Sequence, residues 1–146
     1  MRLAILMSGV VCLASSAYAD PHSVFGTFLT EDGESHIEIL DCGNGSPCGR
    51  VVWVDPASIE DGTRPEDLKT RSGQDVLGLQ ILEGFTRKKR DWRGGTIYSP
   101  EEDKTYASRL KSKEDGSLQV KGCIGPICQT QVWGAVNAST DPSAGE

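Results

Sequence analysis

Cysteine is the residue type with the clearest chemistry in this chain. Four of the five cysteines form two closely spaced pairs, Cys42 with Cys48 and Cys123 with Cys128, and each pair brackets a Gly/Pro-containing turn. Four cysteines allow three connectivities. In an exported protein this even set favours disulfides, and the short spacings favour the two local pairs. The fifth, Cys12, lies in an N-terminal segment that is expected to be removed.

Two other uses of these cysteines are less favoured. A zinc site is disfavoured because neither spacing is the two-residue knuckle of zinc ribbons and no histidine is nearby. A redox-active pair is disfavoured because neither spacing is C-x-x-C. We therefore expect two structural disulfides, no metal and no cofactor.

The sequence offers little for catalysis. Its two histidines are His22, near the expected mature N-terminus, and His36, expected on the outer face of a strand. No nucleophile elbow, zinc-protease, P-loop or dinucleotide-binding motif is present. We expect that the protein is not an enzyme; an enzyme would need titratable side chains with shifted pKa values converging in a cleft.

Each of two charged runs can be interpreted either as a solvent-exposed turn or as a functional site. Glu101-Glu102-Asp103 suits a solvated hairpin turn better than a calcium or catalytic site, since adjacent carboxylates do not make a coordination loop. The basic run at 87–90 could bind an anionic partner, but a solubilising hairpin tip is favoured. The net charge of −6 makes nucleic acid a poor partner.

The aromatic residues are more informative. Strand alternation groups Tyr106 with Ser108 and Leu110, and Gln131 with Trp133. Side chains on one face of a small barrel either fill its core or line a pocket for one small ligand. Both interpretations stay open. The candidate lining residues are Trp53, Phe85, Tyr98, Tyr106, Ser108, Gln131 and Trp133.

Strand signals separated by turn residues predict an all-β fold. The eight expected strands are Val24–Thr30, Ser35–Asp41, Arg50–Asp55, Leu79–Phe85, Trp92–Tyr98, Thr105–Lys111, Ser117–Gly122 and Gln129–Val136. Short connections between so many strands favour an eight-stranded antiparallel up-and-down barrel. One long loop, residues 56–78, joins strands 3 and 4, and Pro65-Glu66-Asp67-Leu68 could open one turn of helix within it.

The N-terminus has the features of a cleavable signal peptide. A positive Met1-Arg2 precedes an apolar run, and the small-x-small sequence Ala17-Tyr18-Ala19 places cleavage before Asp20. A membrane anchor is disfavoured because the run is shorter than the roughly 20 residues needed to span a bilayer. A lipoprotein is disfavoured because Val11 precedes Cys12. We expect a signal peptide over 1–19, one domain over 20–136, a flexible polar tail over 137–146, and a periplasmic or secreted location.

Several short motifs lie along residues 24–134: Gly26-Thr27-Phe28, Cys42 with Cys48-Gly49-Arg50-Val51-Val52-Trp53, Gly78-Leu79, Trp92 with Gly94-Gly95, Ile97-Tyr98-Ser99-Pro100-Glu101, Lys104-Thr105-Tyr106, Gly122-Cys123, Cys128 and Thr130-Gln131-Val132-Trp133. Together they resemble the domain-of-unknown-function family 2147, small exported bacterial proteins with a lipocalin-like barrel. Phe28 stands where that family usually has tryptophan, and Asp103 where a turn glycine is usual.

The resemblance implies a lipocalin-like barrel and, by fold analogy, binding of a small hydrophobic or amphipathic ligand. In that hypothesis the loop over 56–78 is a lid. The alternative is an envelope interaction module with a filled core that acts through its outer surface and this loop.

Overall fold

The computed structural model of the protein describes residues 23–136. The predicted signal peptide, Cys12, His22 and the predicted tail lie outside the described residues. Within the part of the chain that is described, no helix is long and apolar enough to cross a membrane.

Strands dominate this part of the chain. Their bounds are β1 Gly26–Leu29, β2 Ser35–Asp41, β3 Pro47–Val54, β4 Gln80–Glu83, β5 Thr86–Arg87, β6 Trp92–Ser99, β7 Lys104–Ser112, β8 Leu118–Ile124 and β9 Ile127–Ala135. The eight predicted strands are all present. The two-residue β5, at the base of the basic hairpin tip, was not predicted.

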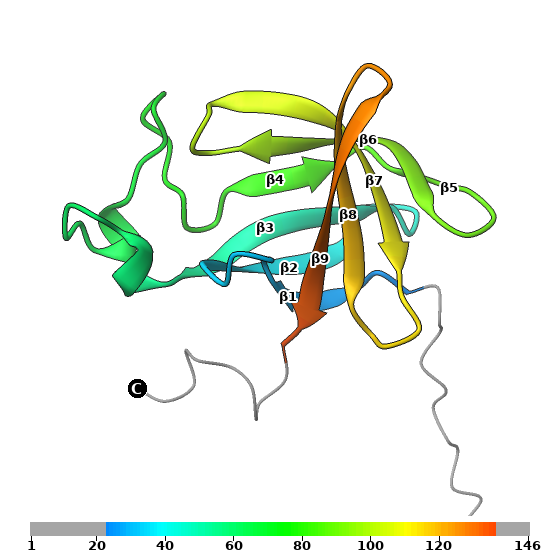
Figure 1. The fold of residues 1–146 in the computed structure, drawn as a ribbon, viewed down its shortest axis with the longest axis horizontal. Helices are drawn as coiled ribbons and strands as arrows, with labels where there is room; N and C mark the ends of the chain where they lie inside the picture. The colour runs from blue at the N-terminus through cyan, green and yellow to red at the C-terminus, as the bar shows by residue number, and fades with distance from the viewer. Residues whose placement is uncertain (1–22, 137–146) are drawn as a thin grey trace, which may run out of the picture.

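The strands form one closed antiparallel barrel (Figure 1). Consecutive strands pair from β1 to β4 and from β5 to β9, β9 returns to β1, and β4 pairs with β6, so eight strands form a ring and β5 extends only the start of β6. The predicted eight-stranded up-and-down barrel is therefore confirmed. Closure removes the free sheet edges that would otherwise invite pairing with other chains.

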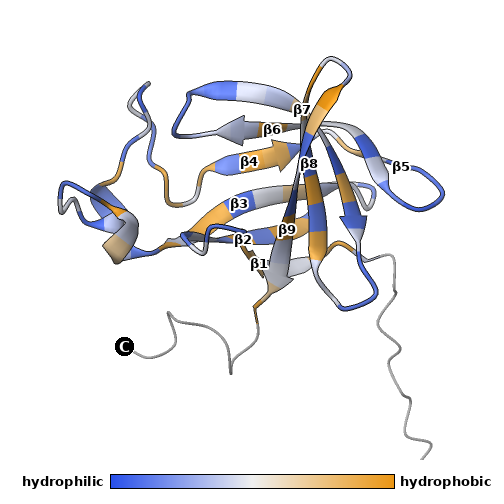
Figure 2. Ribbon diagram, viewed as in Figure 1, coloured by the Kyte–Doolittle hydropathy of each residue, from blue (hydrophilic) through white to orange (hydrophobic). Residues whose placement is uncertain are grey.

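Alternation along the strands separates the inside of the barrel from the outside. On β7, Ser108 and Leu110 are buried, whereas Ala107 and Arg109, which alternate with them, are exposed. Figure 2 shows the resulting hydrophobic and hydrophilic bands along β7 and β8. A side chain on every second residue therefore points into the barrel, as the period of two dictates.

His36 departs from the expectation of an exposed outer residue. It lies beside the inward Ile37 and at a register shift between β2 and β3. Its ring packs against that of Trp53, with centroids 4.4 Å apart, and only 2% of the residue is exposed. The outer face is thus locally covered, because a large aromatic side chain stands opposite the histidine.

Bulky side chains fill one half of the barrel interior. They include Phe28, Phe85, Trp92, Leu110, Leu118 and Trp133, all buried. The strand register places Trp92 opposite Leu110 and Leu118 opposite Trp133, so these side chains form a layer. This layer is the packed core that closes the end of the barrel carrying the β2–β3 and β7–β8 turns.

The two predicted disulfides both form, one at each end of the barrel. Cys42–Cys48 clips the β2–β3 turn at the packed end, and Cys123–Cys128 clips the β8–β9 hairpin at the other. At the packed end, the Ser46 hydroxyl also donates a 2.7 Å hydrogen bond to the Phe85 carbonyl. The hairpin turns at both ends are therefore constrained by covalent bonds.

The long segment between β3 and β4 is ordered by short-range hydrogen bonds. It contains the 3-10 turns Pro56–Ser58 and Pro65–Asp67, the second at the predicted proline-initiated turn. The Val76 amide donates to the Leu68 carbonyl at 3.0 Å, and Val76 is buried. The loop is thus a structured part of the barrel wall, anchored by apolar side chains.

We expect Gly95→Ala to destabilise the barrel by about 2 kcal/mol, since overpacking a core typically costs 1–3 kcal/mol. A methyl group on Gly95 would lie 2.4 Å from Cδ1 of Phe85, and that ring is itself buried. Urea unfolding measures the loss. Gly134→Ala is the matched control, because no atom lies within 4 Å of its added Cβ. Equal stability of the two variants would contradict the packing described here.

We expect replacement of either cystine by two alanines to lower the free energy of unfolding by about 2 kcal/mol, the loop-closure value for rings this short. The sequence separations of 6 and 5 residues are nearly equal, so the two double variants should lose similar amounts. Urea unfolding of both variants tests this. Loss of folding in one of them alone would show that its turn contributes more than chain entropy.

Candidate functional site

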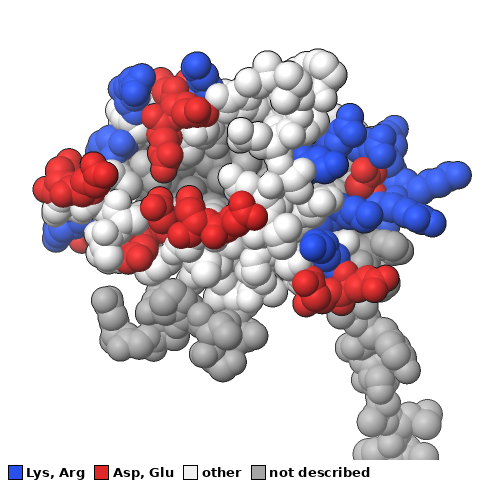
Figure 3. Space-filling view, in the orientation of Figure 1, with Lys and Arg blue, Asp and Glu red and all other residues white. Residues whose placement is uncertain are grey.

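A cavity of about 780 Å³ occupies the half of the barrel that the aromatic side chains leave open. The turns between β1 and β2, β6 and β7, and β8 and β9, together with the long loop, surround its mouth. Figure 3 shows the surface hollowed at this place, between groups of acidic side chains. The volume lies within the range of small-molecule binding sites.

The cavity walls are mostly aliphatic. Strands and loop contribute Ile37, Val51, Val54, Ile59, Leu68, Val76, Ile81, Ile97 and Val120. These side chains are shorter than the rings of the packed half, so the same barrel that is filled at one end is hollow at the other. Gly122 on β8 adds to the space, because it presents no side chain to the cavity.

Six carboxylates line the mouth, and they come from three separate segments. The β1–β2 turn supplies two, the long loop two, and the β6–β7 turn two: Asp32, Glu34, Glu60, Asp61, Glu101 and Glu102. Among the described residues that line the cavity, Lys69 is the one basic side chain, and its ammonium is paired with Asp75. The mouth is therefore strongly negative.

The like charges at the mouth affect one another. The pKa of the Glu34 carboxyl is raised, chiefly by the neighbouring Asp32 and then by burial, by Glu101 across the mouth and by Asp55. Asp61 behaves differently, since hydrogen bonds from the Thr63 side chain and backbone lower its pKa. The raised pKa of Glu34 thus reflects the negative potential at the entrance, to which the β1–β2 turn and the β6–β7 turn both contribute.

The β6–β7 turn is held by tyrosine hydroxyls. The Tyr106 hydroxyl donates a 2.6 Å hydrogen bond to Glu102, which raises the pKa of Tyr106. The Tyr98 hydroxyl donates to Asp103, which also accepts from the Ser72 hydroxyl at 3.2 Å. The acidic run predicted as a solvated turn is indeed a turn, but two of its carboxylates also line the cavity mouth.

Asp103 occupies a turn position at which the sequence resemblance leads us to expect glycine. Its φ is +53°, a backbone conformation that glycine adopts most readily. Aspartate is one of the residues that tolerate it. Its carboxylate ties the β6–β7 turn to the long loop through Ser72, a link that glycine could not make.

The β8–β9 hairpin adds an apolar lip to the mouth. Ile124 and Ile127 line the cavity there and are 69% and 74% exposed. The disulfide between Cys123 and Cys128 holds the two strands together directly behind this tip. The entrance therefore combines acidic turns with an exposed aliphatic hairpin.

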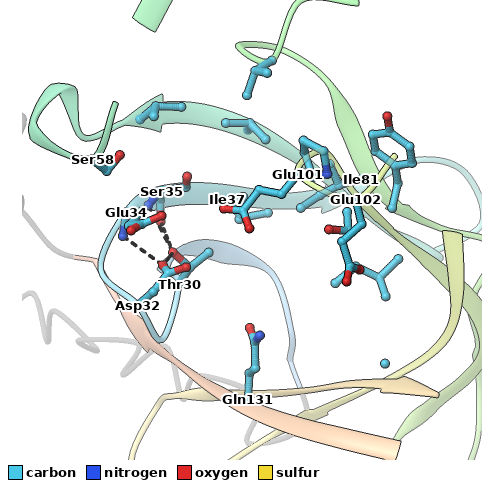
Figure 4. A pocket seen from close by; sticks show the side chains of 18 of the residues that line it. Thr30, Asp32, Glu34, Ser35, Ile37, Ser58, Ile81, Glu101, Glu102 and Gln131 are labelled. Carbon is cyan, nitrogen blue, oxygen red and sulfur yellow. Dashed lines mark hydrogen bonds between the residues drawn. The ribbon is translucent and has the colours of Figure 1, made fainter. Parts of the chain in front are cut away.

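Three of the seven predicted lining residues lie in the cavity wall. Tyr98 and Tyr106 stand at the mouth, and Gln131 reaches in from β9. In Figure 4 the side chains of Glu101, Glu102 and Gln131 point into the same space. The structure therefore brings two aromatic rings and one amide together with the carboxylates, rather than a continuous aromatic wall.

The other four predicted residues do not line the cavity. Trp53 packs against His36, and Phe85 belongs to the packed core. The buried Ser108 hydroxyl donates to the Lys121 carbonyl at 2.7 Å. Trp133 lies in the core, and its indole donates to the Gln131 side chain at 2.8 Å. It therefore positions a lining residue without being one.

Sequence reasoning missed the aliphatic wall. Only aromatic and polar residues are predicted as lining, although the inward faces of the strands also carry aliphatic side chains such as Ile37. On β8 the inward residues Val120 and Ile124 flank the small Gly122. A glycine at an inward position is a signal in the sequence that the barrel interior is not filled there. Among residues 23–136, no group of three or more His, Cys, Asp or Glu side chains is arranged to hold a metal ion.

Comparison with solved structures supports the fold. Protein HP1028 from the human pathogen Helicobacter pylori, whose structure is described as belonging to the lipocalin family, matches with a TM-score of 0.64 and 19% sequence identity. The match covers 81% of this chain and 86% of that one. At this identity the similarity establishes a shared lipocalin-like barrel and nothing about ligands. No curated protein matches this chain.

The family model described as "Uncharacterized protein conserved in bacteria (DUF2147)" matches residues 26–134. This range runs from the first residue of β1 almost to the end of β9, so it spans the whole barrel, including the long loop and both disulfides. With its barrel, its two cystine-clipped turns and this match along most of its length, the chain belongs to the DUF2147 family.

Proposed function

We propose that this protein is an exported, non-enzymatic carrier or sensor that binds one small hydrophobic or amphipathic molecule inside the barrel. The observation that carries the proposal is the cavity of about 780 Å³ with its aliphatic walls. A well-packed domain of this size leaves few voids larger than a water molecule. A hollow of this volume in an otherwise filled barrel is a feature that a binding function accounts for.

The apolar walls can supply the affinity. Burial of apolar surface contributes about 25 cal/mol per Å², so a ligand that buries roughly 300 Å² gains about 7 kcal/mol before the costs of association. Gln131 offers an amide for orientation, and the loop residues Ile59 and Leu68 cover the ligand from the side of the mouth. The lipocalin family named for the similar structure is a fold analogy that agrees with this use of the barrel.

A second candidate function is an interaction module of the cell envelope that acts through its surface. The exposed Ile124 and Ile127 favour it, since a rigid apolar hairpin tip is a usual feature of protein contact sites. The two functions make opposite predictions for changes inside the barrel.

We expect Gly122→Leu to abolish binding of the uncharged fluorophore N-phenyl-1-naphthylamine, or to weaken it at least tenfold. An added Cβ at Gly122 meets only Ile97 and Tyr106, at 3.6 and 4.0 Å, which is ordinary van der Waals contact, and the rest of the leucine side chain would extend into the cavity that Gly122 lines. Fluorescence titration of the disulfide-bonded protein measures the affinity.

Gly134→Leu is the matched control, because position 134 does not line the cavity and has no atom within 4 Å of an added Cβ. It should bind as tightly as the unaltered protein. If the unaltered protein does not bind the fluorophore, or if Gly122→Leu binds it equally well, the proposal of a cavity ligand fails and the interaction module gains support.

Export is the second part of the proposal. It is supported by the signal-peptide sequence and by the two cystines, which form and persist in oxidising compartments. We expect the protein recovered from the periplasm or medium of its bacterial host to begin at Asp20, which intact-mass spectrometry and N-terminal sequencing would determine. An N-terminus at Met1 in the cytoplasm, with free thiols, would refute export.

A further inference from the structure

We propose that the ligand is a cationic amphiphile, with an apolar body inside the barrel and an organic cation, such as an ammonium group, at the mouth. This inference rests on the proposed function and names the class of ligand for the same cavity. The cavity itself argues for the apolar body, and the charge of its rim argues for the head group.

The rim carboxylates surround the entrance rather than gathering on one side of it. They come from the β1–β2 turn, the loop residues 60–61 and the β6–β7 turn. Pairing of β2 with β3 places the first two segments side by side, and the closing pairing of β4 with β6 adds the third. Figure 3 shows acidic side chains on several sides of the hollow, together with a few basic ones, and a larger group of basic side chains at the other side of the molecule, near β5. A head group at the mouth is thus close to negative charge on several sides.

Two basic side chains of the long loop, Arg64 and Lys69, are held in ion pairs. Lys69 is neutralised by Asp75, which lies outside the cavity lining. The guanidinium of Arg64, on the same loop, is paired with Glu66 and Asp67 at 3.2 and 2.8 Å. Arg71 on this loop and Lys104 at the start of β7 are exposed but do not line the cavity, so an anionic head group inside the mouth would lie nearer to carboxylates than to these cations.

The hydroxyl donors around the mouth also point to a cation. Thr30 donates to Asp32 at 2.6 Å, Ser58 to the Asp55 carbonyl at 2.7 Å, and Tyr106 to Glu102. These hydroxyls are occupied by acceptors of the protein, so they do not offer hydrogen bonds to an anion. Ser35, Ser99, Gln129 and Gln131 also line the cavity, but its charged acceptors are the six rim carboxylates, whose oxygens accept hydrogen bonds from an ammonium group.

The rim carboxylates repel one another, and a bound cationic head group would reduce this repulsion. Glu34 lies half-buried at the mouth, and the charges of Asp32 and Glu101 together raise its pKa. A bound cation would lower the potential that these side chains share. At a separation near 6 Å in water, one carboxylate changes the affinity for a unit charge by about threefold. Several carboxylates together are therefore expected to give a preference of tenfold or more.

Three amphiphiles with a linear chain of twelve carbons test the proposal, each used below its micelle concentration. They are dodecyltrimethylammonium, which is cationic, dodecyldimethylamine oxide, which has no net charge at pH 7.5, and dodecanoate, which is anionic and whose twelve carbons include the carboxylate carbon. Isothermal titration calorimetry on the disulfide-bonded protein measures each affinity at low salt and in 0.5 M NaCl. We expect the cation to bind at least about tenfold more tightly than the amine oxide, the anion to bind most weakly, and salt to reduce the differences.

The outcomes separate this inference from the proposed function. If all three amphiphiles bind with equal affinity, or if dodecanoate binds most tightly, the cationic head group is refuted and the apolar cavity ligand stands. If none of them binds and N-phenyl-1-naphthylamine also fails, the proposed function itself fails.

Variants of the rim provide the second readout. Glu34→Gln and Glu101→Gln should each weaken dodecyltrimethylammonium about threefold and leave dodecyldimethylamine oxide unchanged, because both keep the size of the side chain. Glu114→Gln, an exposed carboxylate in the β7–β8 turn outside the cavity lining, should change neither. Equal weakening of both amphiphiles by the rim variants would mean that these side chains shape the mouth without attracting charge, and would overturn the proposal.

Discussion

Closure of the sheet is the constraint on which the rest of the molecule depends. The ring is completed by two short pairings, β1 with β9 through Phe28–Ala135 and Leu29–Gly134, and β4 with β6 through Leu82–Ile97 and Glu83–Thr96. Once the ring is closed, every strand has one face that water cannot reach from the side. The alternation of side chains along each strand then becomes a division between interior and surface.

The closed interior is used in two ways. Rings occupy the half nearest the β2–β3 and β7–β8 turns, where Phe85 lies directly over Gly95 and leaves no space for a methyl group. Aliphatic side chains line the other half and do not meet across it. The packed half gives the barrel a conventional core, which allows the open half to remain hollow without loss of the fold. The packed half of the barrel thus provides stability, and the hollow half provides the binding cavity.

The turns at the open end carry the chemical character of the mouth. Antiparallel meander topology brings alternate connections to the same end, so the β1–β2, β6–β7 and β8–β9 turns and the long loop meet there. Asp103 links two of these segments, through the Tyr98 hydroxyl and the Ser72 hydroxyl. The Cys123–Cys128 bond braces a third. A mouth built from braced turns can hold several carboxylates around one entrance despite their repulsion.

The sequence by itself determined the strands, the antiparallel barrel and the two cystine pairs, because alternation, turn residues and cysteine spacing act over a few residues. It could not determine at which level of the barrel an inward residue lies. Level depends on strand register and on bulges such as those near His36 and Gly95. For that reason Trp133 and Phe85 fill the core while Tyr106 and Gln131 line the cavity, although alternation treats them alike. Only the tertiary structure could bring the acidic turns together around one entrance, because closure of the ring sets which distant segments meet.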